Sequence, residues 1–226
     1  MLKKRLVGVV TVKDGGAVQS FGYERYLPLG RPEVLIENLD RWGADEIVLQ
    51  CIDRSAREAG PDLVLLERVG RKGLSTPLIY AGGIRSTEHA VAAVKAGADR
   101  VCVDALLHDA PVAVQELSAQ LGAQAVIASL PLARGPDGLT WLDHRSHRQH
   151  PVGRALLDVL GSGAVSEILV VDWRHEGLPG QFDVGLLTAL PPLSLPLIAF
   201  GGLSDPAQLR EVLQIERVSA VAIGNF

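Results

Sequence analysis

The sequence predicts a parallel (β/α)8 barrel, formed as a single domain over residues 1–226. Short apolar runs alternate with amphipathic segments along the chain, as expected for parallel strands that are buried on both faces and separated by helices. Eight such units fit into a length close to the ~250 residues typical of this fold. The stretch around residues 78–86 is also echoed at 197–205, which indicates a barrel built from two similar halves.

The predicted strands are short runs rich in Val, Ile, Leu and Ala. They cover residues 6–12, 46–51, 78–80, 101–103, 125–130, 168–171, 197–200 and 220–223. The predicted helices have amphipathic spacing, and several start at a proline or after a capping side chain. They begin near Pro32, Asp62, Thr87, Pro111, Val152, Val184 and Pro206. Seven helices for eight strands means that the final helix of the barrel is absent from the pattern.

Composition excludes several classes of partner. The chain has 22 Lys and Arg against 26 Asp and Glu, and only 4% of its residues are aromatic. It therefore lacks the positive field and the base-stacking surface that nucleic-acid binding requires. Cys51 and Cys102 stand far apart, so neither a disulfide framework nor a cysteine-rich zinc site is expected, and we predict no metal and no cofactor.

The amino terminus has the start of a signal peptide, with basic residues 3–5 followed by the apolar run 6–12. Lys13 and Asp14 end that run before a full hydrophobic region forms, so it is interpreted as the first strand. No later apolar stretch approaches the ~20 residues that a membrane helix needs. We therefore expect a soluble, cytoplasmic protein without a membrane partner.

Two glycine pairs follow predicted strands and precede predicted helices. Gly82-Gly83 and Gly201-Gly202 would let backbone N–H groups approach an anion at a helix amino terminus, so two pairs predict two phosphate groups on a small-molecule ligand. The second site could be completed by Gly177, Gly224 and Asn225. The alternative is that these glycines only form tight turns, and their repetition in both halves weighs against it.

Four charged residues of alternating sign stand at the amino ends of predicted strands: Arg5, Glu46, Arg100 and Glu167. In a barrel these positions converge on the amino-terminal mouth, here named the bottom, where they could pair across the axis and close it. The alternative is a set of solvated charges or a network that only stabilises the fold.

Three histidines, His144, His147 and His150, follow the fifth strand with Arg145 and Arg148 between them. Spacing of three would allow metal ligation on a helix, but the neighbouring cations oppose a metal ion. A solvated basic loop that meets a phosphorylated ligand is the favoured interpretation.

Five short motifs occur in register over essentially the whole chain. They are Val12-Lys13-Asp14-Gly15, Gly43-Ala44-Asp45-Glu46, Gly82-Gly83-Ile84-Arg85-Ser86, Gly97-Ala98-Asp99-Arg100-Val101 and Gly201-Gly202. Together they resemble the cyclase subunit of imidazole glycerol phosphate synthase, the HisF family. The resemblance implies a substrate with two phosphates and ammonia supplied by a separate, HisH-like glutaminase subunit docked at the bottom of the barrel.

Carried over by position, the resemblance gives Arg5, Glu46, Arg100 and Glu167 the role of the charged gate through which ammonia enters. Arg100 replaces the usual lysine and keeps the charge. Asp99 falls where the family has an aspartate at the glutaminase interface.

The residues at the carboxyl ends of the strands, opposite the bottom of the barrel, depart from the family pattern. The two aspartates that act there as general acid and base are replaced by Thr11 and Pro131, neither of which can perform that chemistry, so the catalytic residues are unknown. Cys51 and Gln19 replace an aspartate and a lysine, and Asp104 replaces an asparagine of a phosphate site.

These departures favour a barrel that conducts ammonia but no longer makes imidazole glycerol phosphate. Paralogues of this kind accompany a glutaminase-like partner and a sugar amidotransferase in surface-polysaccharide biosynthesis, where ammonia converts an acetamido group into an amidine. One alternative is an authentic cyclase, a lyase of histidine biosynthesis, with a rebuilt acid–base pair. Another is a non-catalytic phosphate-binding barrel.

Overall fold

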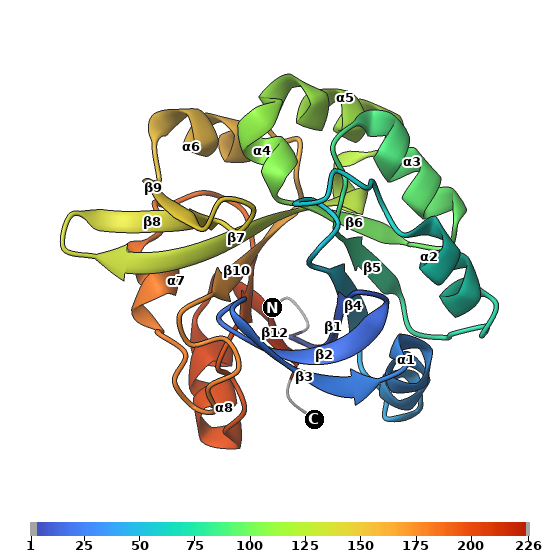
Figure 1. Ribbon diagram of the computed structural model, residues 1–226. Coiled ribbons are helices and arrows are strands. Elements are labelled where there is room, and N and C mark those ends of the chain that lie inside the picture. Colours follow the sequence, from blue (N-terminus) through green and yellow to red (C-terminus); the bar gives the residue numbers. More distant parts are fainter. Residues whose placement is uncertain (1–3, 225–226) are drawn as a thin grey trace.

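The structure is a computed structural model that describes residues 4–224. It contains a closed barrel of eight parallel strands surrounded by helices, as Figure 1 shows in a view along the barrel axis. The barrel strands are β1 (Arg5–Lys13), β4 (Glu46–Cys51), β5 (Leu78–Ala81), β6 (Arg100–Val103), β7 (Val126–Gly135), β10 (Glu167–Asp172), β11 (Leu197–Phe200) and β12 (Val218–Ile223). They pair in this order, and pairing of β7 with β10 and of β12 with β1 closes the circle. The predicted fold and its eight strands are confirmed.

Seven helices lie where the sequence predicts them: α1 (Pro32–Arg41), α2 (Leu63–Gly70), α3 (Thr87–Lys95), α5 (Pro111–Leu121), α6 (Arg154–Gly161), α7 (Gly185–Ala189) and α8 (Pro206–Gln214). Proline occupies the first turn of α1, α5 and α8, and the carboxylate of Asp62 caps α2 by accepting the Leu65 N–H. The short helix α4 (Ala105–Asp109) was not predicted. No helix within residues 4–224 has the length and hydrophobicity needed to cross a membrane.

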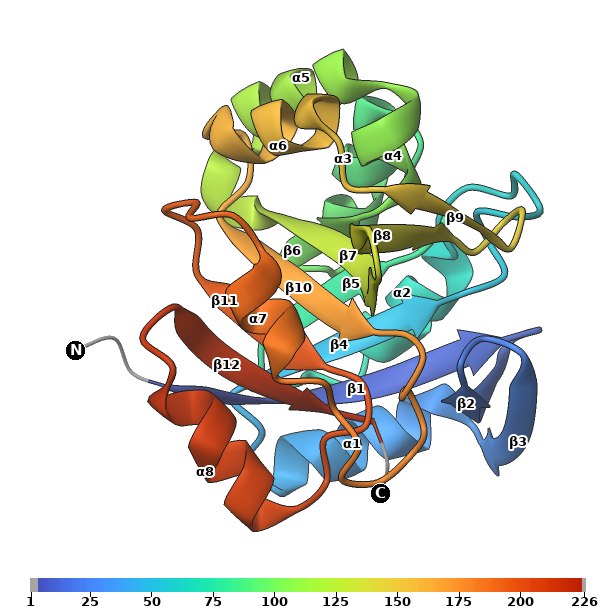
Figure 2. The same cartoon turned by 90° about the vertical axis from the view of Figure 1, so that its left-hand side faces the viewer.

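Four further strands were also missed. β2 (Gly16–Phe21) and β3 (Arg25–Gly30) extend β1, while β8 (Gly138–Asp143) and β9 (Arg148–Pro151) extend β7. Both groups lie at the carboxyl ends of the barrel strands, on the right in Figure 2. The turn between β1 and β2 is Asp14-Gly15, both with positive φ, a dipeptide that favours two-residue hairpins and could have predicted this one.

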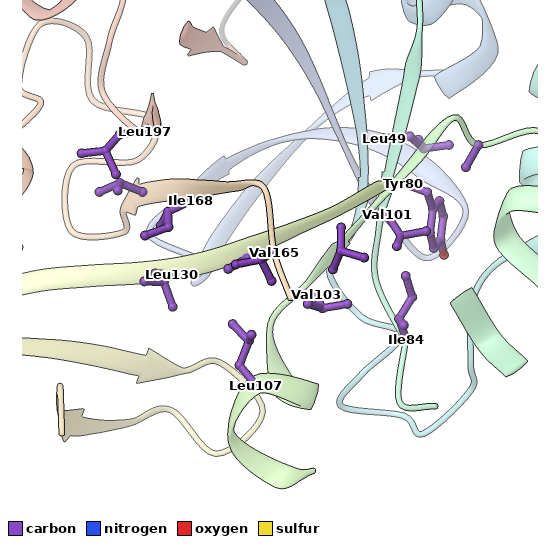
Figure 3. Close-up of a cluster of buried hydrophobic side chains, with 14 of the residues drawn as sticks. Leu49, Tyr80, Ile84, Val101, Val103, Leu107, Leu130, Val165, Ile168 and Leu197 are labelled. Carbon is purple, nitrogen blue, oxygen red and sulfur yellow. The ribbon is translucent and has the colours of Figure 1, made fainter. Parts of the chain in front are cut away.

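Two apolar layers hold the barrel together. The outer layer packs the strands against the helices, and Figure 3 shows part of it, with Leu49, Tyr80 and Val101 among its side chains. The inner layer fills the barrel, because side chains alternate along each strand. Its members include Val7, Val48, Ile79, Cys102, Ile127, Leu169, Ile198 and Ala220, all at most 3% exposed.

The hairpins close this inner layer at the carboxyl end. Tyr23, between β2 and β3, and Leu142, on β8, both belong to the inner cluster. The barrel interior is therefore a packed apolar column that is covered by two segments added to the barrel.

Candidate functional site

A small cavity of about 50 Å³ lies at the carboxyl mouth of the barrel. Its wall includes Gln50 on β4, Pro131 on β7, and Gly82 and Asp104, which directly follow β5 and β6. The two hairpin regions add Tyr23 and His144. A cavity of this volume holds a few water-sized molecules.

His144 and Asp104 form a close pair in this wall. The distance from His144 Nδ1 to Asp104 Oδ2 is 3.0 Å, and the two side chains are only 17% and 22% exposed. Burial alone would lower the pKa of His144, but the hydrogen bond and negative charge of Asp104 outweigh it, and the pKa is raised above its usual value. The pair therefore places a histidine that favours its protonated form beside a carboxylate at the mouth.

This arrangement revises the prediction of a solvated basic loop for His144 and His150 only, because residues 146–149 are exposed as predicted. His144 is mostly buried, and His150 stacks on the Trp141 ring with centroids 4.8 Å apart. His147 does lie in an open cleft beside the mouth. The loop departs from the prediction because β8 and β9, two strands that were not predicted, fold it back over the barrel. The structure described for residues 4–224 contains no group of three or more His, Cys, Asp or Glu side chains that could hold a metal ion.

Tyr23 is held in the mouth by contacts of its hairpin with the segment after β10. The Gly22 N–H donates to Glu176, at 2.8 Å to Oε2 and 3.1 Å to the backbone oxygen. The buried hydroxyl of Tyr23 accepts a hydrogen bond from Gln50 Nε2 at 3.1 Å. Glu176 itself is buried, and this burial raises the pKa of its carboxyl. The hairpin thus acts as a lid that is docked on a buried acid.

The first glycine pair lines the mouth cavity, yet close packing already requires glycine there. A Cβ on Gly82 would lie 2.3 Å from the Cys51 backbone oxygen, and one on Gly83 would lie 2.2 Å from that of Gly60. The Gly83 N–H donates to Ser55 Oγ at 3.2 Å. These contacts support the reading in which the glycines allow close approach of the backbone.

The second set of glycines lines a separate cavity of only about 10 Å³. Its members are Gly177, Gly201, Gly202 and Gly224, joined by Thr11 and Glu176, while Asn225 lies outside the described residues. Each predicted phosphate position therefore has a carboxylate beside it, Asp104 in one and Glu176 in the other. An ionised carboxylate opposes a phosphate at either position.

At the bottom of the barrel the four predicted charges form a closed ring. Glu46 contacts Arg5 Nη1 at 2.7 Å and Arg100 Nη1 at 3.1 Å, and Arg100 Nη1 lies 2.8 Å from Glu167 Oε2. An ion pair between Arg5 and Glu167 completes the circle. The structure thus brings together all four residues that the sequence placed at this mouth.

The ring is supported by hydroxyl groups around it. Ser219 Oγ donates to Glu167 Oε1 at 2.7 Å, and Arg100 Nη2 donates to Ser166 Oγ at 2.8 Å. Burial would raise the pKa of Glu167, but the Ser219 hydroxyl and the two arginines outweigh it and lower that pKa. The ring faces a broad depression of about 600 Å³ that also includes Gln124 and Pro196.

Asp99 lies beside the ring, on the rim of the bottom face. One of its carboxylate oxygens accepts the Leu78 N–H at 2.7 Å and so fixes the amino end of β5. Asp45 does the same for Leu6 at 2.9 Å. Asp99 therefore has a structural role that requires no partner protein.

The protein is a (β/α)8 barrel with an acid–histidine pair at its carboxyl mouth and an ion-pair ring at its bottom. The sequence matches the histidine biosynthesis protein family over residues 5–226. It is 31% identical to a putative imidazole glycerol phosphate synthase subunit hisF2 of Vibrio vulnificus, covering 93% of this chain and 78% of that protein. It is also 30% identical to the imidazole glycerol phosphate synthase subunit HisF of Exiguobacterium sibiricum, covering 100% of this chain and 91% of that one. The chain belongs to the histidine biosynthesis protein family and is a HisF-like member of it.

Proposed function

We propose that this chain is the barrel subunit of a glutamine-dependent amidotransferase, which conducts ammonia from a HisH-like glutaminase to an acceptor at the carboxyl mouth. The observation that carries the proposal is the closed ring of Arg5, Glu46, Arg100 and Glu167 at the bottom. A ring of paired charges on the barrel axis is a natural gate, because shifting one arginine would open a path without leaving a charge unpaired in an apolar site.

The barrel interior suits passage of neutral ammonia. Beyond the ring, the axis is lined by apolar side chains such as Val48, Ile127 and Leu169. An apolar, water-poor interior disfavours the ammonium ion and so keeps nitrogen in its nucleophilic form. In this proposal Asp99, on the rim of the ring, lies at the edge of the glutaminase interface.

The mouth supports an acceptor other than the bisphosphate of the cyclase reaction. Thr11 and Pro131 supply no acid–base pair, and each of the two glycine positions lies beside a carboxylate. Conversion of a sugar acetamido group to an amidine, in surface-polysaccharide biosynthesis, fits a subunit that only delivers ammonia. A sugar amidotransferase would then receive it at the mouth.

The direct test combines the purified chain with the HisH-like glutaminase from the same organism and measures glutamate release. We expect a stable complex and glutaminase activity that rises on binding. Replacing Arg100→Met should abolish ammonia delivery while the complex still forms, whereas Arg154→Met, at an exposed position on α6, should change neither. Absence of any complex would contradict the proposal.

One observation favours authentic cyclase activity as a second candidate function: the His144–Asp104 pair could replace the missing aspartates. Turnover of the open-chain bisphosphate substrate of the cyclase, measured with ammonium salt and no glutaminase, separates the two. Turnover that is lost in His144→Gln would establish the cyclase. A folded protein without turnover would leave ammonia delivery as the function.

Phosphate binding at the two glycine pairs stays a prediction. Equilibrium dialysis with inorganic phosphate tests it, and Asp104→Asn should increase the affinity because it removes the opposing charge.

A further inference from the structure

The hairpin of β8 and β9, residues 138–151, is here named the flap, and its turn is docked on both ends of the short helix α4. His144 Nδ1 lies 3.0 Å from the carboxylate of Asp104, the residue before the helix. Arg145 Nη2 donates to Asp109, the last residue of the helix, at 3.1 Å. Two charged side chains of one turn thus hold the two ends of one helix.

A stack of aromatic rings makes a third contact between the flap and α4. The His108 ring, on α4, lies flat against the Trp141 ring, on β8, with centroids 3.5 Å apart and planes 6° from parallel. His108 Nε2 is buried and has no hydrogen-bond partner among residues 4–224. A proton added to this nitrogen would place a charged donor in the stack without an acceptor. Attraction of the cation to the indole face offsets only part of that cost.

The histidines at these contacts titrate in opposite directions. Burial lowers the pKa of His108, and the charges of Asp104 and Asp109 only partly oppose it. Burial acts in the same direction on His144, but the hydrogen bond and charge of Asp104 outweigh it and raise that pKa. Docking support from His108 is therefore present above the ordinary histidine pKa of 6.5 and is lost as pH falls through the lowered value. Support from His144 is present below 6.5 and is lost as pH rises through the raised value.

We propose that the flap is a pH-sensitive cover of the mouth, which stays docked on α4 while His144 is protonated and His108 is neutral. The part that moves is the turn, residues 144–147. Leu142 anchors the flap just before the turn, because it is packed in the inner apolar layer, and β8 stays paired with β7. The inference goes beyond the proposed function, since it concerns access to the mouth for any molecule.

Release of the turn would change the space above the barrel. His144 lies in the wall between the mouth cavity and an open cleft of about 220 Å³, and Tyr23 and Ile52 also line both spaces. Gln50 lines the mouth cavity, and its Oε1 atom is buried without a hydrogen-bond partner in the described part of the chain. Removing His144 from the wall would join the two spaces and let a ligand in the cleft reach the Gln50 oxygen.

The charged and titratable groups around the two histidines come from several segments. Asp104, Asp143 and Arg145 act on both, and Asp109 acts on His108. Burial raises the pKa of Asp143, but Arg145 and Ser146 outweigh it and lower that pKa to about 2, so Asp143 stays ionised at neutral pH. The remaining groups are Tyr23, Lys13, Asp53, Arg57 and His147 in the cleft, His150 on the other face of Trp141, Arg174 beside β9, and the exposed Glu116, Arg154 and Asp158 on α5 and α6.

Hydrogen exchange of the flap amides tests the proposal in the 226-residue chain. It is measured between pH 5 and pH 8.5, with labelling times scaled to the intrinsic exchange rate at each pH. We expect protection of the flap to be highest near pH 6.5 and to fall toward both ends of the range. The fall should reach about tenfold for each unit by which a histidine pKa differs between the docked and released states. The amides of α1, which lies across the barrel in Figure 1, are the reference and should show no such maximum.

Each histidine should control one side of this profile. His144→Gln keeps a side chain that can donate to Asp104 but has no charge, so the fall toward alkaline pH should disappear. His108→Phe keeps a ring against Trp141 without a nitrogen that can be protonated, so the fall toward acid pH should disappear. His147→Asn is the matched control, because His147 is exposed on the same turn and asparagine tolerates its φ of +55°. This variant should keep both falls.

Equal protection at all pH values, or a fall on one side only, in the unchanged protein would overturn the proposal. So would a folded His144→Gln or His108→Phe protein that keeps both falls. Asp104→Asn and His108→Gln address the same two sides if the first variants fail to fold, because they remove the partner of His144 and the titratable ring of His108. The measurement needs no glutaminase, so its failure is separate from failure of the glutaminase complex to form.

Discussion

At the residue scale, Glu176 shows how a buried acid can organise the carboxyl end of a barrel. The residue is 5% exposed, and its carboxylate accepts the Gly22 N–H that docks the lid. Its pKa is raised, so the folded chain binds the proton more tightly than the unfolded chain does. Stability from this group is therefore present at low pH and is lost as pH rises from the ordinary glutamate range through the raised pKa.

We accordingly expect Glu176→Gln to stabilise the protein at pH 7, by about 1 kcal/mol, because the amide keeps an acceptor for Gly22 without burying a charge. Urea unfolding at several pH values between 4 and 8 measures this, and the gain should shrink toward acid pH. Glu211→Gln, at an exposed position on α8, is the matched control and should have little effect. A loss of stability at pH 7 would show that the lid requires the carboxylate.

At the scale of elements, the lid depends on one close backbone approach. Gly177 has a φ of +84°, and a Cβ there would lie 2.3 Å from the Ser20 backbone oxygen on β2. Gly180 has a similar φ of +71° with nothing within 4 Å of the added atom. A side chain at either position would strain the backbone, and only at Gly177 would it also clash with a neighbouring atom.

Gly177→Ala should therefore destabilise the protein by about 2 kcal/mol or more and expose the lid, whereas Gly180→Ala should cost only about 1 kcal/mol from its backbone conformation. Hydrogen exchange of the β2 and β3 amides gives the readout that separates them. Exchange in both strands should rise in Gly177→Ala alone. Equal exchange in the two variants would mean that the hairpin is held by other contacts.

At the scale of the whole molecule, the bottom ring links four strands that are distant in the sequence. Glu167 is central to it, because it meets both arginines and Ser219. Its lowered pKa means that its stabilising contribution is present above the ordinary glutamate pKa and is lost as pH falls through the lower value of the folded state.

Glu167→Gln should cost about 2 kcal/mol at pH 7, somewhat less than the loss of a partner from a fully buried pair, since the arginines stay partly exposed. The same substitution should flatten the fall in stability at acid pH. Asp158→Asn, which breaks the exposed pair between Arg154 and Asp158 on α6, should change stability by less than about 0.5 kcal/mol. Thermal unfolding at pH 7 and near pH 3.5 compares the two variants, and equal losses would contradict a ring that acts as one network.

The sequence by itself determined the barrel strands, the places of seven helices and the four charges at the bottom. These features follow from local patterns in the sequence. Runs of apolar residues form buried strands, and proline and capping residues mark where helices start. A charged residue at the end of a strand keeps that place once the strand is part of the barrel. The lid hairpin also has a local signal, because Asp14-Gly15 is a dipeptide that favours two-residue turns.

Only the tertiary structure decided what the mouth can do. His144 and Asp104 lie 40 positions apart in the sequence on segments that meet only when the barrel closes and β8 folds back across it, and no local pattern encodes that meeting. The same holds for the insertion of Tyr23 and for the unpaired oxygen of Gln50, which depend on strand register and packing. A strand can be predicted from the alternation of its own side chains. A site requires side chains from several segments to be in contact, and that contact forms only when the barrel closes.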